Sequence, residues 1–370
     1  MPRSGSSRRG RRATRKPAVR KGQGTWPLSR DEFTRRFDER FYDPAFDAVR
    51  PELARIHKIA AGGYFEYRKS PRKRRAGAAF ARPGFELPIE WLETRAKIRE
   101  AERAQRNRRS RSRVLLVCAA SRNDKTCPGE MSKTWRLVQA AKRTMLAQRF
   151  EVDLLDLSVL TSEYGRAILP CKACVSTAMP LCHWPCSCYP NHALGQVNDW
   201  MNELYPRWVA AHGIMIVTPV YWYQAPSGLK LMMDRLVCAD GGNPDPTTTR
   251  GKDPMLAKAL ELKGWPYPRH LAGRAFSVIV HGDAEGVDTL RRSLVDWLSD
   301  MELVPAGAAA NFDRYVGYYE PYATSHDALD RDRALFAEVR DAARSLVNAV
   351  RMIRGGRREP DAGLSPPRPK

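Results

Sequence analysis

The chain lacks any apolar run near the roughly 20 residues that a membrane-spanning helix needs, so we expect no membrane partner. Ser7-Arg8-Arg9 is similar to a twin-arginine export signal, but the apolar segment of such a signal does not follow it. The amino terminus also lacks acidic residues and is rich in Arg and Ser, which is typical of organelle transit peptides. A transit peptide is therefore the alternative to the cytoplasmic location that we expect. The sequence also lacks internal repeats.

Acidic residues are scarce relative to basic ones, because 41 Asp and Glu stand against 63 Lys and Arg and leave a net charge of +22. Residues 1–24, 68–75 and 95–113 together carry the whole of this excess, so the rest of the chain is close to neutral. Such a basic region is compatible with a solvated arm, with non-specific binding to a nucleic-acid backbone, or with docking onto an acidic partner. A recognised nucleic-acid-binding motif is absent, and the sequence leaves the three roles open.

Composition divides the chain into four parts. Residues 1–24 are dominated by Arg, Gly and Ser and are predicted to be a disordered basic arm. Residues 25–112 are predicted to be a helical extension and linker, with a capping box at Ser29-x-x-Glu32 and a basic loop at residues 68–77. Residues 113–354 are predicted to form the main domain, and residues 355–370 a disordered tail.

Short apolar runs alternate with longer amphipathic segments from residue 113 onward. The predicted strands span residues 114–118, 152–157, 214–218, 275–280 and 303–308. The predicted helices span residues 132–150, 196–211, 225–237, 287–301 and 327–354. This alternation predicts an α/β fold with a doubly wound, five-stranded parallel sheet, in the flavodoxin-like strand order 2-1-3-4-5.

Two loops that follow predicted strands carry candidate binding residues. The loop at residues 119–134 offers hydroxyl groups and two cations before a helix, where free amides and the helix dipole favour an anion such as phosphate. Its candidates are Ser121, Arg122, Lys125, Thr126, Ser132 and Thr134. Ordinary capping of the helix by Ser132 is the alternative.

The second loop lies in residues 218–235 and is rich in aromatic residues. Its candidates are Pro219, Val220, Tyr221, Trp222 and Tyr223. Their rings and amides suit a flat, conjugated ligand such as an isoalloxazine at the carboxyl end of a strand. Alternatively, the three aromatic side chains pack against the extension or against a second subunit.

Together these two loops, with the Leu-Lys-x-x-x-Asp-Arg run at residues 229–235, resemble the NADPH-dependent FMN reductase family over about residues 113–307. The resemblance implies a flavodoxin-like fold, bound FMN and a homo-oligomer. It implies that Ser121, Arg122, Ser132 and Thr134 hold the FMN phosphate, that residues 219–223 border the isoalloxazine, and that Lys230, Asp234 and Arg235 are structural or interface residues. Nine residues separate Arg122 from Ser132, and this long spacing makes Thr126 a rival phosphate ligand.

The resemblance also implies a third flavin loop after the fourth strand, formed here by His281, Gly282, Asp283 and Gly286. Glycines let a backbone approach a ligand closely. His281 is predicted to bond the flavin or an acceptor, with a bond to the backbone as the alternative. Asp283 is either a site residue or the cap of the next helix.

Five of the eight cysteines lie within one short segment: Cys171, Cys174, Cys182, Cys186 and Cys188. Without a secretion signal they do not indicate a disulfide scaffold. Their density suits a [4Fe–4S] cluster or a Zn²⁺ ion, and the alternative is packed or redox-active thiols. Iron–sulfur flavoproteins, which are relatives, begin their motif with two successive two-residue gaps, but this chain widens the second gap to seven. We expect the segment at the same sheet end as the flavin loops.

The function that the resemblance implies is an oxidoreductase. NADPH or NADH would reduce bound FMN, which would then reduce a quinone, a free flavin, an iron–sulfur centre or a protein acceptor. No catalytic side chain is predicted, because the flavin carries the chemistry. One alternative is an iron–sulfur flavoprotein-type electron carrier without NAD(P)H activity. Another is a flavodoxin-like module whose basic arm binds nucleic acid.

Overall fold

The computed structural model describes residues 17–24, 27–127 and 129–357. Most of the predicted basic arm and most of the predicted tail, residues 1–16 and 358–370, lie outside the described residues. Within the described part, no helix combines the length and the apolar character that crossing a membrane requires.

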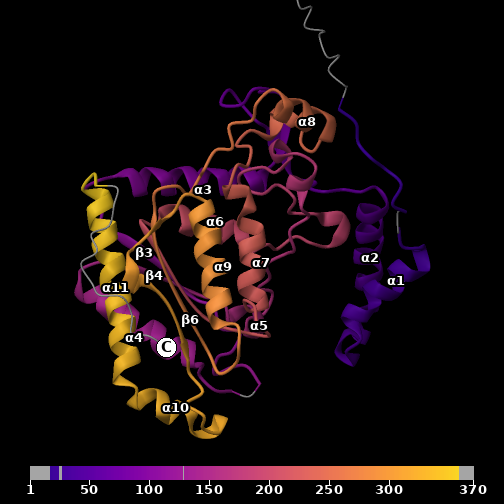
Figure 1. Cartoon of the computed structure of the whole chain (residues 1–370). Helices are drawn as coiled ribbons and strands as arrows, with labels where there is room; N and C mark the ends of the chain where they lie inside the picture. The colour runs from indigo at the N-terminus through magenta and orange to yellow at the C-terminus, as the bar shows by residue number, and fades with distance from the viewer. Residues whose placement is uncertain (1–16, 25–26, 128, 358–370) are drawn as a thin grey trace, which may run out of the picture.

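The centre of the fold is a six-stranded parallel sheet (Figure 1). Its strands are β3 (Arg113–Cys118), β4 (Glu151–Asp156), β5 (Gly213–Pro219), β6 (Ala275–Gly282), β7 (Val304–Pro305) and β8 (Asn311–Tyr315). They lie in the order β4-β3-β5-β6, and β7 and β8 both pair with β6. This order confirms the predicted flavodoxin-like α/β fold, and it brings the carboxyl ends of all the strands to one edge.

The last strand differs from the prediction. Only two residues of the expected strand at residues 303–308 pair with β6, because Gly307 turns the chain at φ +107° and a short 3₁₀ helix follows, Ala308–Ala310. The chain then returns to β6 as β8, whose sequence Asn-Phe-Asp-Arg-Tyr contains no apolar run.

The described helices are α1 (Arg30–Asp38), α2 (Arg50–Phe65), α3 (Ile89–Arg106), α4 (Lys133–Ala147), α5 (Val159–Ser162), α6 (Met201–Ala210), α7 (Ser227–Leu236), α8 (Pro254–Leu262), α9 (Val287–Asp300), α10 (Tyr322–Arg331) and α11 (Arg333–Arg354). Successive strand residues face opposite sides of the sheet. Val114 and Leu116 therefore pack with α4 and α11, whereas Leu115 and Val117 pack with α6, α7 and α9. Two helical layers cover the sheet, as Figure 1 shows.

Two helical predictions and one loop prediction need correction. Helix α6 begins at Met201 and not at residue 196, because the preceding residues form a turn with an Asn191–Gln196 bridge. The predicted helix at residues 327–354 is two helices, and Asp332 caps the second by accepting a hydrogen bond from the Leu335 amide. The predicted basic loop contains one strand of a small hairpin, β1 (Lys73–Arg75) with β2 (Glu86–Pro88).

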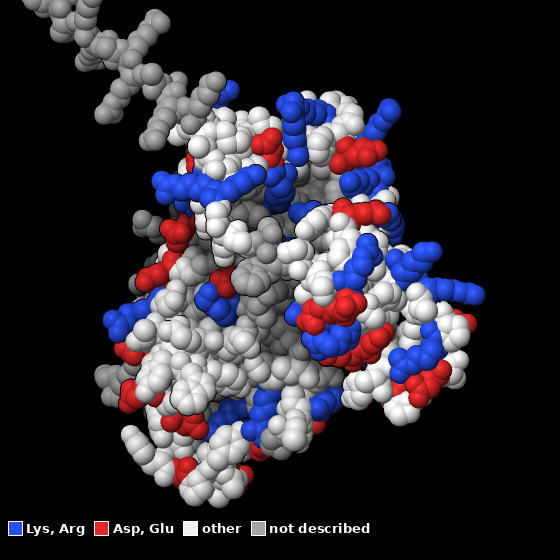
Figure 2. Space-filling model, turned by 90° about the vertical axis from the view of Figure 1, so that its right-hand side faces the viewer, with Lys and Arg blue, Asp and Glu red and all other residues white. Residues whose placement is uncertain are grey.

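The extension packs on the cysteine-bearing part of the chain. Ser29 caps α1 as predicted, and α2 lies against residues 192–194. The indole Nε1 of Trp91 in α3 donates to the Pro185 carbonyl over 2.8 Å. On the face in Figure 2, basic side chains lie beside acidic ones instead of forming one unbroken basic area. Arg35 and Arg36, for example, both pair with Glu32.

Candidate functional site

A cavity of about 240 Å³ lies at the carboxyl edge of the sheet. Its lining comes from the loops after β3, β5, β6 and β8 and from the start of α10: Ala120, Arg122, Ser132, Lys133, Thr134, Pro219, Val220, Tyr221, His281, Gly282, Asp283, Val316 and Tyr322. Open α/β sheets bind their ligands at this edge, where the connections diverge.

One side of the cavity is cationic. Lys133, in the first turn of α4, is only 8% exposed, and its Nζ donates to the Val316 carbonyl over 3.2 Å. Burial lowers the pKa of Lys133. Arg122 pairs with Glu130 and bonds the Tyr322 hydroxyl, yet its buried Nε has no hydrogen-bond partner among the described residues. The cations and the amino end of α4 together favour an anion.

His281 joins two of these loops. Its Nε2 lies 2.8 Å from the Thr134 hydroxyl, and both side chains are buried. Burial, and next the nearby Lys133, lower the pKa of His281 to about 3, so the ring is neutral at physiological pH. The bond to Thr134 differs from both sequence predictions, which gave this histidine a ligand or a backbone partner.

The aromatic loop is a tight turn. Tyr221 and Gln224 exchange two backbone hydrogen bonds of 2.9 Å, and the two residues between them have positive φ angles, 44° for Trp222 and 64° for Tyr223. Two positive φ angles define the type I′ turn, which favours Asn-Gly and disfavours bulky side chains. Trp222 is nevertheless 92% exposed and packs little. Strain of this kind without a packing reason points to a binding role.

Two positions of the third loop must be glycine because neighbouring atoms leave no room for a Cβ. A Cβ on Gly282 would lie 2.4 Å from the Val220 side chain, and one on Gly286 would lie 2.9 Å from the Tyr223 backbone. Gly286 itself precedes α9 without any side-chain cap, so Asp283 does not cap that helix. Asp283 lines the cavity instead.

The cavity collects most of the predicted residues. Nine line it: Arg122, Ser132, Thr134, Pro219, Val220, Tyr221, His281, Gly282 and Asp283. Six do not: Ser121, Lys125, Thr126, Trp222, Tyr223 and Gly286. Thr126 bonds within its own turn, to Asn123. Two lining residues, Lys133 and Tyr322, were not predicted from the sequence. Lys133 could have been, because it lies between two predicted phosphate ligands, Ser132 and Thr134.

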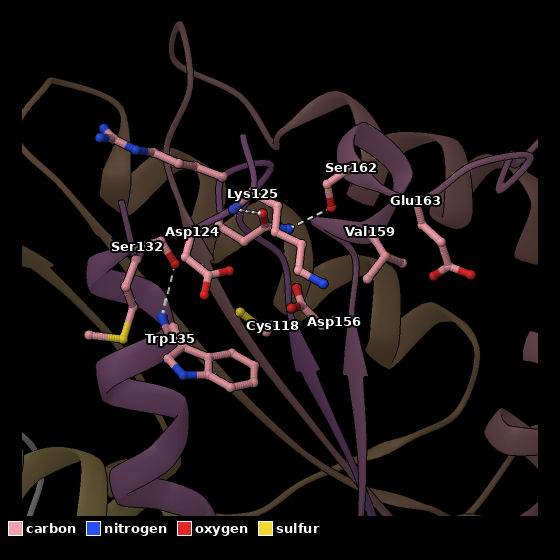
Figure 3. Close-up of a pocket in the computed structure, with 12 residues that line it drawn as sticks. Cys118, Asp124, Lys125, Ser132, Trp135, Asp156, Val159, Ser162 and Glu163 are labelled. Atoms are coloured by element: carbon pink, nitrogen blue, oxygen red, sulfur yellow. Dashed lines mark hydrogen bonds between the residues drawn. The ribbon is translucent and has the colours of Figure 1, made fainter. Parts of the chain in front are cut away.

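A second cavity of about 410 Å³ adjoins the first, because Arg122 and Ser132 line both. It lies between the first loop and α5, where Asn123 donates to Ser158 and Ser162 over 2.8 Å each. In Figure 3, Lys125 extends toward Asp156 over the ends of β3 and β4. Trp135, in the first turn of α4, lines the same cavity.

Comparison with known proteins gives a family match over residues 112–315, to the model of NADPH-dependent FMN reductase. This match spans more than half of the chain. The chain belongs to the NADPH-dependent FMN reductase family. This is the family that the loops of the sequence resemble.

Individual relatives of this reductase are distant. An iron-sulfur flavoprotein of Methanosarcina thermophila is 29% identical over 102 residues, 28% of this chain and 44% of that protein. The chain thus spans less than half of the length of that relative. RosB with a bound flavin-derived intermediate has a TM-score of 0.47 at 13% identity, covering 66% of this chain and 81% of RosB. A flavone reductase has a TM-score of 0.39 at 19% identity, and the match covers 69% of this chain and 68% of that reductase. These TM-scores add nothing to the family assignment.

The cysteine segment of this reductase is not at the flavin-loop end of the sheet. Cys171 lies beside Val237 and Met301, which follow the ends of α7 and α9. Those helices run back from the carboxyl edge, so the segment lies at the amino edge, and the expected shared edge is wrong. Cys238, which also follows α7, lies near the thiols of Cys182 and Cys186 and contributes to the raised pKa of Cys182.

These thiols do not fit a metal centre. Across the described residues, no three His, Cys, Asp or Glu side chains are placed so that they could hold a metal ion. Both ring nitrogens of His183 are engaged, by Ser187 and Thr249. The Lys252 ammonium lies 3.5 Å from the Cys174 sulfur. The arrangement therefore does not support the predicted iron–sulfur or zinc site among the described residues.

Proposed function

We propose that the cavity at the carboxyl edge binds FMN and that the protein is an NAD(P)H-dependent oxidoreductase that passes electrons to a second acceptor. Bound FMN would accept hydride from the nicotinamide and deliver the electrons onward. The contribution of the protein is binding, orientation and polarity, because none of the lining residues needs to act as a nucleophile or base.

The observation that carries this proposal is the buried Nε of Arg122, which lacks an acceptor among the described residues in a cavity that four strand ends share. Buried donors are normally satisfied, so the empty donor position fits a ligand oxygen. Lys133 and the first turn of α4 supply further positive potential beside it. A phosphate monoester matches this donor set.

The aromatic side chains suit the remainder of such a ligand. The cavity is smaller than the roughly 300–1,000 Å³ of common ligand sites, so part of the ligand must lie along its rim. Tyr221 and Tyr322 line the cavity and remain partly exposed, and Trp222, which follows Tyr221 in the turn, is 92% exposed. Exposed aromatic faces of this kind favour stacking with a conjugated ring system.

Replacement of Arg122 tests the phosphate contact. We expect Arg122→Ala to raise the Kd for FMN by about 10- to 100-fold, because a hydrogen bond to a charged group contributes roughly 1.5–3 kcal/mol. Riboflavin, which lacks the phosphate, should lose less than about threefold. Fluorescence titration of the apoprotein with both flavins measures this difference.

Lys125→Ala is the matched control, because it removes one positive charge from the same loop but faces the second cavity. Its Kd for FMN should stay within about threefold of the wild-type value. Equal losses for FMN and riboflavin in Arg122→Ala would place the phosphate elsewhere. Absence of FMN binding by the wild-type protein would overturn the proposed function itself.

The aromatic turn gives a second prediction. Replacing Trp222-Tyr223 by Asn-Gly introduces the pair that a type I′ turn favours, and we expect the free energy of unfolding to rise by about 1–2 kcal/mol as the strain is relieved. NADH or NADPH oxidation should fall at the same time, because the exposed rings are lost. Urea unfolding and a steady-state assay measure the two effects. A variant that is both less stable and fully active would show that the rings serve packing alone.

A further inference from the structure

Two cysteines of the amino-edge cluster, Cys174 and Cys188, form a close pair. Their Sγ atoms lie 3.2 Å apart. Two thiolates on one tetrahedral Zn²⁺ would be separated by about 3.8 Å, given Zn–S bonds of about 2.3 Å. A disulfide needs about 2.05 Å, so an approach of little more than 1 Å would join the two sulfurs. The two thiols are therefore in hydrogen-bonding contact and close enough for a small movement to join them as a disulfide.

Cys188 and a nearby lysine stabilise the reactive form of Cys174. Lys252 Nζ donates to the Leu181 carbonyl over 2.7 Å and to Cys174 Sγ over 3.5 Å. The hydrogen bond from Cys188, assisted by Lys252 and opposed by burial, lowers the pKa of Cys174 to about 6. Cys174 is then a thiolate at neutral pH, and thiolates are the nucleophiles in disulfide exchange.

The neighbouring thiols lack these properties. Burial raises the pKa of Cys182 and of Cys238, and a hydrogen bond with Cys188 together with burial raises the pKa of Cys186. All three are buried, whereas Cys174 is partly exposed. Within the cluster, the structure therefore directs small electrophiles to Cys174.

We propose that Cys174 and Cys188 form a redox-active dithiol that reduces low-molecular-weight disulfides, at a site separate from the flavin cavity. The Cys174 thiolate attacks one sulfur of the disulfide, which forms a mixed disulfide and releases one thiolate. Cys188 then attacks Cys174 Sγ, which forms the Cys174–Cys188 disulfide and expels the second thiolate. The proton of Cys188 goes to a departing thiolate, and the dithiol loses the two electrons that the small disulfide gains.

Glutathione disulfide is the probe that tests this proposal. The full-length, FMN-treated protein is first reduced and desalted, then incubated with glutathione disulfide, quenched in acid, alkylated and mapped by peptide mass spectrometry. We expect a Cys174–Cys188 linkage and two equivalents of glutathione released per chain. The rate should rise with pH around the pKa of about 6 that Cys174 has.

Variants separate the two steps. Cys188→Ser should stop at a mixed disulfide on Cys174, with one glutathione retained. Cys174→Ser should leave Cys188 unmodified. Cys171→Ser is the matched control, since its thiol is also partly exposed but faces another cavity, and it should leave the linkage unchanged. Lys252→Met should move the midpoint of the pH–rate profile upward, which a merely structural lysine would not do.

Two results would overturn the proposal. One is glutathione on Cys171 or on the exposed Cys127 while Cys174 and Cys188 stay free. The other is iron with acid-labile sulfide bound to the protein and released by Cys174→Ser or Cys188→Ser. Neither result bears on FMN binding at the opposite edge of the sheet, so the two proposals fail independently.

Discussion

Lowering the pH from 6.5 to 4.5 should cost the wild-type protein about 2 kcal/mol of stability more than it costs a His281→Gln variant. The imidazole of His281 is buried against Thr134, and burial lowers its pKa from 6.5 to about 3. One pKa unit corresponds to about 1.4 kcal/mol. The neutral ring is thus a pH-dependent part of the folding free energy.

The sign follows from proton uptake. Below pH 6.5 the unfolded chain binds a proton at this histidine, whereas the folded protein does not bind it until the pH approaches 3. The stability is therefore fully present above pH 6.5 and is lost as the pH falls toward 3. Over that whole window the loss amounts to about 5 kcal/mol. Gln can still bond Thr134 and does not titrate, so its curve lacks this slope.

Urea unfolding at pH 7.5, 6.5, 5.5 and 4.5, followed by tryptophan fluorescence without added flavin, measures the difference. Burial also lowers the pKa of His212, to about 4, at the amino edge of the sheet. His212→Gln should therefore also reduce the pH dependence of the free energy of unfolding. The effects of His212→Gln and His281→Gln should add, because the two sites are distant. Parallel curves for wild type and His281→Gln would show that His281 takes up its proton equally in both states.

The sequence predicted the parts of the fold that local pattern controls. Strands such as β3 and β5 are continuous apolar runs buried on both faces, and buried parallel strands have that pattern. Strand β8 was not predicted because its sequence lacks a strand pattern, and pairing with β6, a tertiary contact, makes it a strand. The break between α10 and α11 was missed because apolar spacing continues across Asp332.

The same limit applies to the candidate sites. Loops at neighbouring strand ends had to meet, so most predicted cavity residues do line one cavity. Lys133 was overlooked because lysines are rarely buried. In the cysteine cluster, spacing along the chain grouped Cys171 with the other four cysteines, although it lines another cavity, and gave no sign of Cys238, which lies 50 residues beyond Cys188. Only the return of α7 toward the amino edge brings Cys238 to the other thiols.

The second large effect concerns a buried ion pair. We expect Asp199→Ala to lower the free energy of unfolding by about 3–5 kcal/mol. The side chains of Asp199 and Arg235 are 1% and 0% exposed and lie 2.5 Å apart. Arg235 also donates to the Leu169 carbonyl over 2.8 Å, and its guanidinium stacks over the Tyr189 ring at 4.7 Å. Removing the carboxylate leaves a buried, unpaired charge.

A control for this prediction lies on α7, the helix that carries Arg235. Asp234 pairs with Lys230 over 2.5 Å, but both side chains are exposed, so Asp234→Ala should change the stability by less than about 0.5 kcal/mol. Urea unfolding at pH 7 compares the two variants, and equal losses would contradict the argument. Adding Arg235→Met to Asp199→Ala should recover part of the loss, because the stranded cation is removed. Arg235 contacts residues 169, 189 and 199, which bracket the cysteines, so this ion pair helps to hold the cysteine segment against α7.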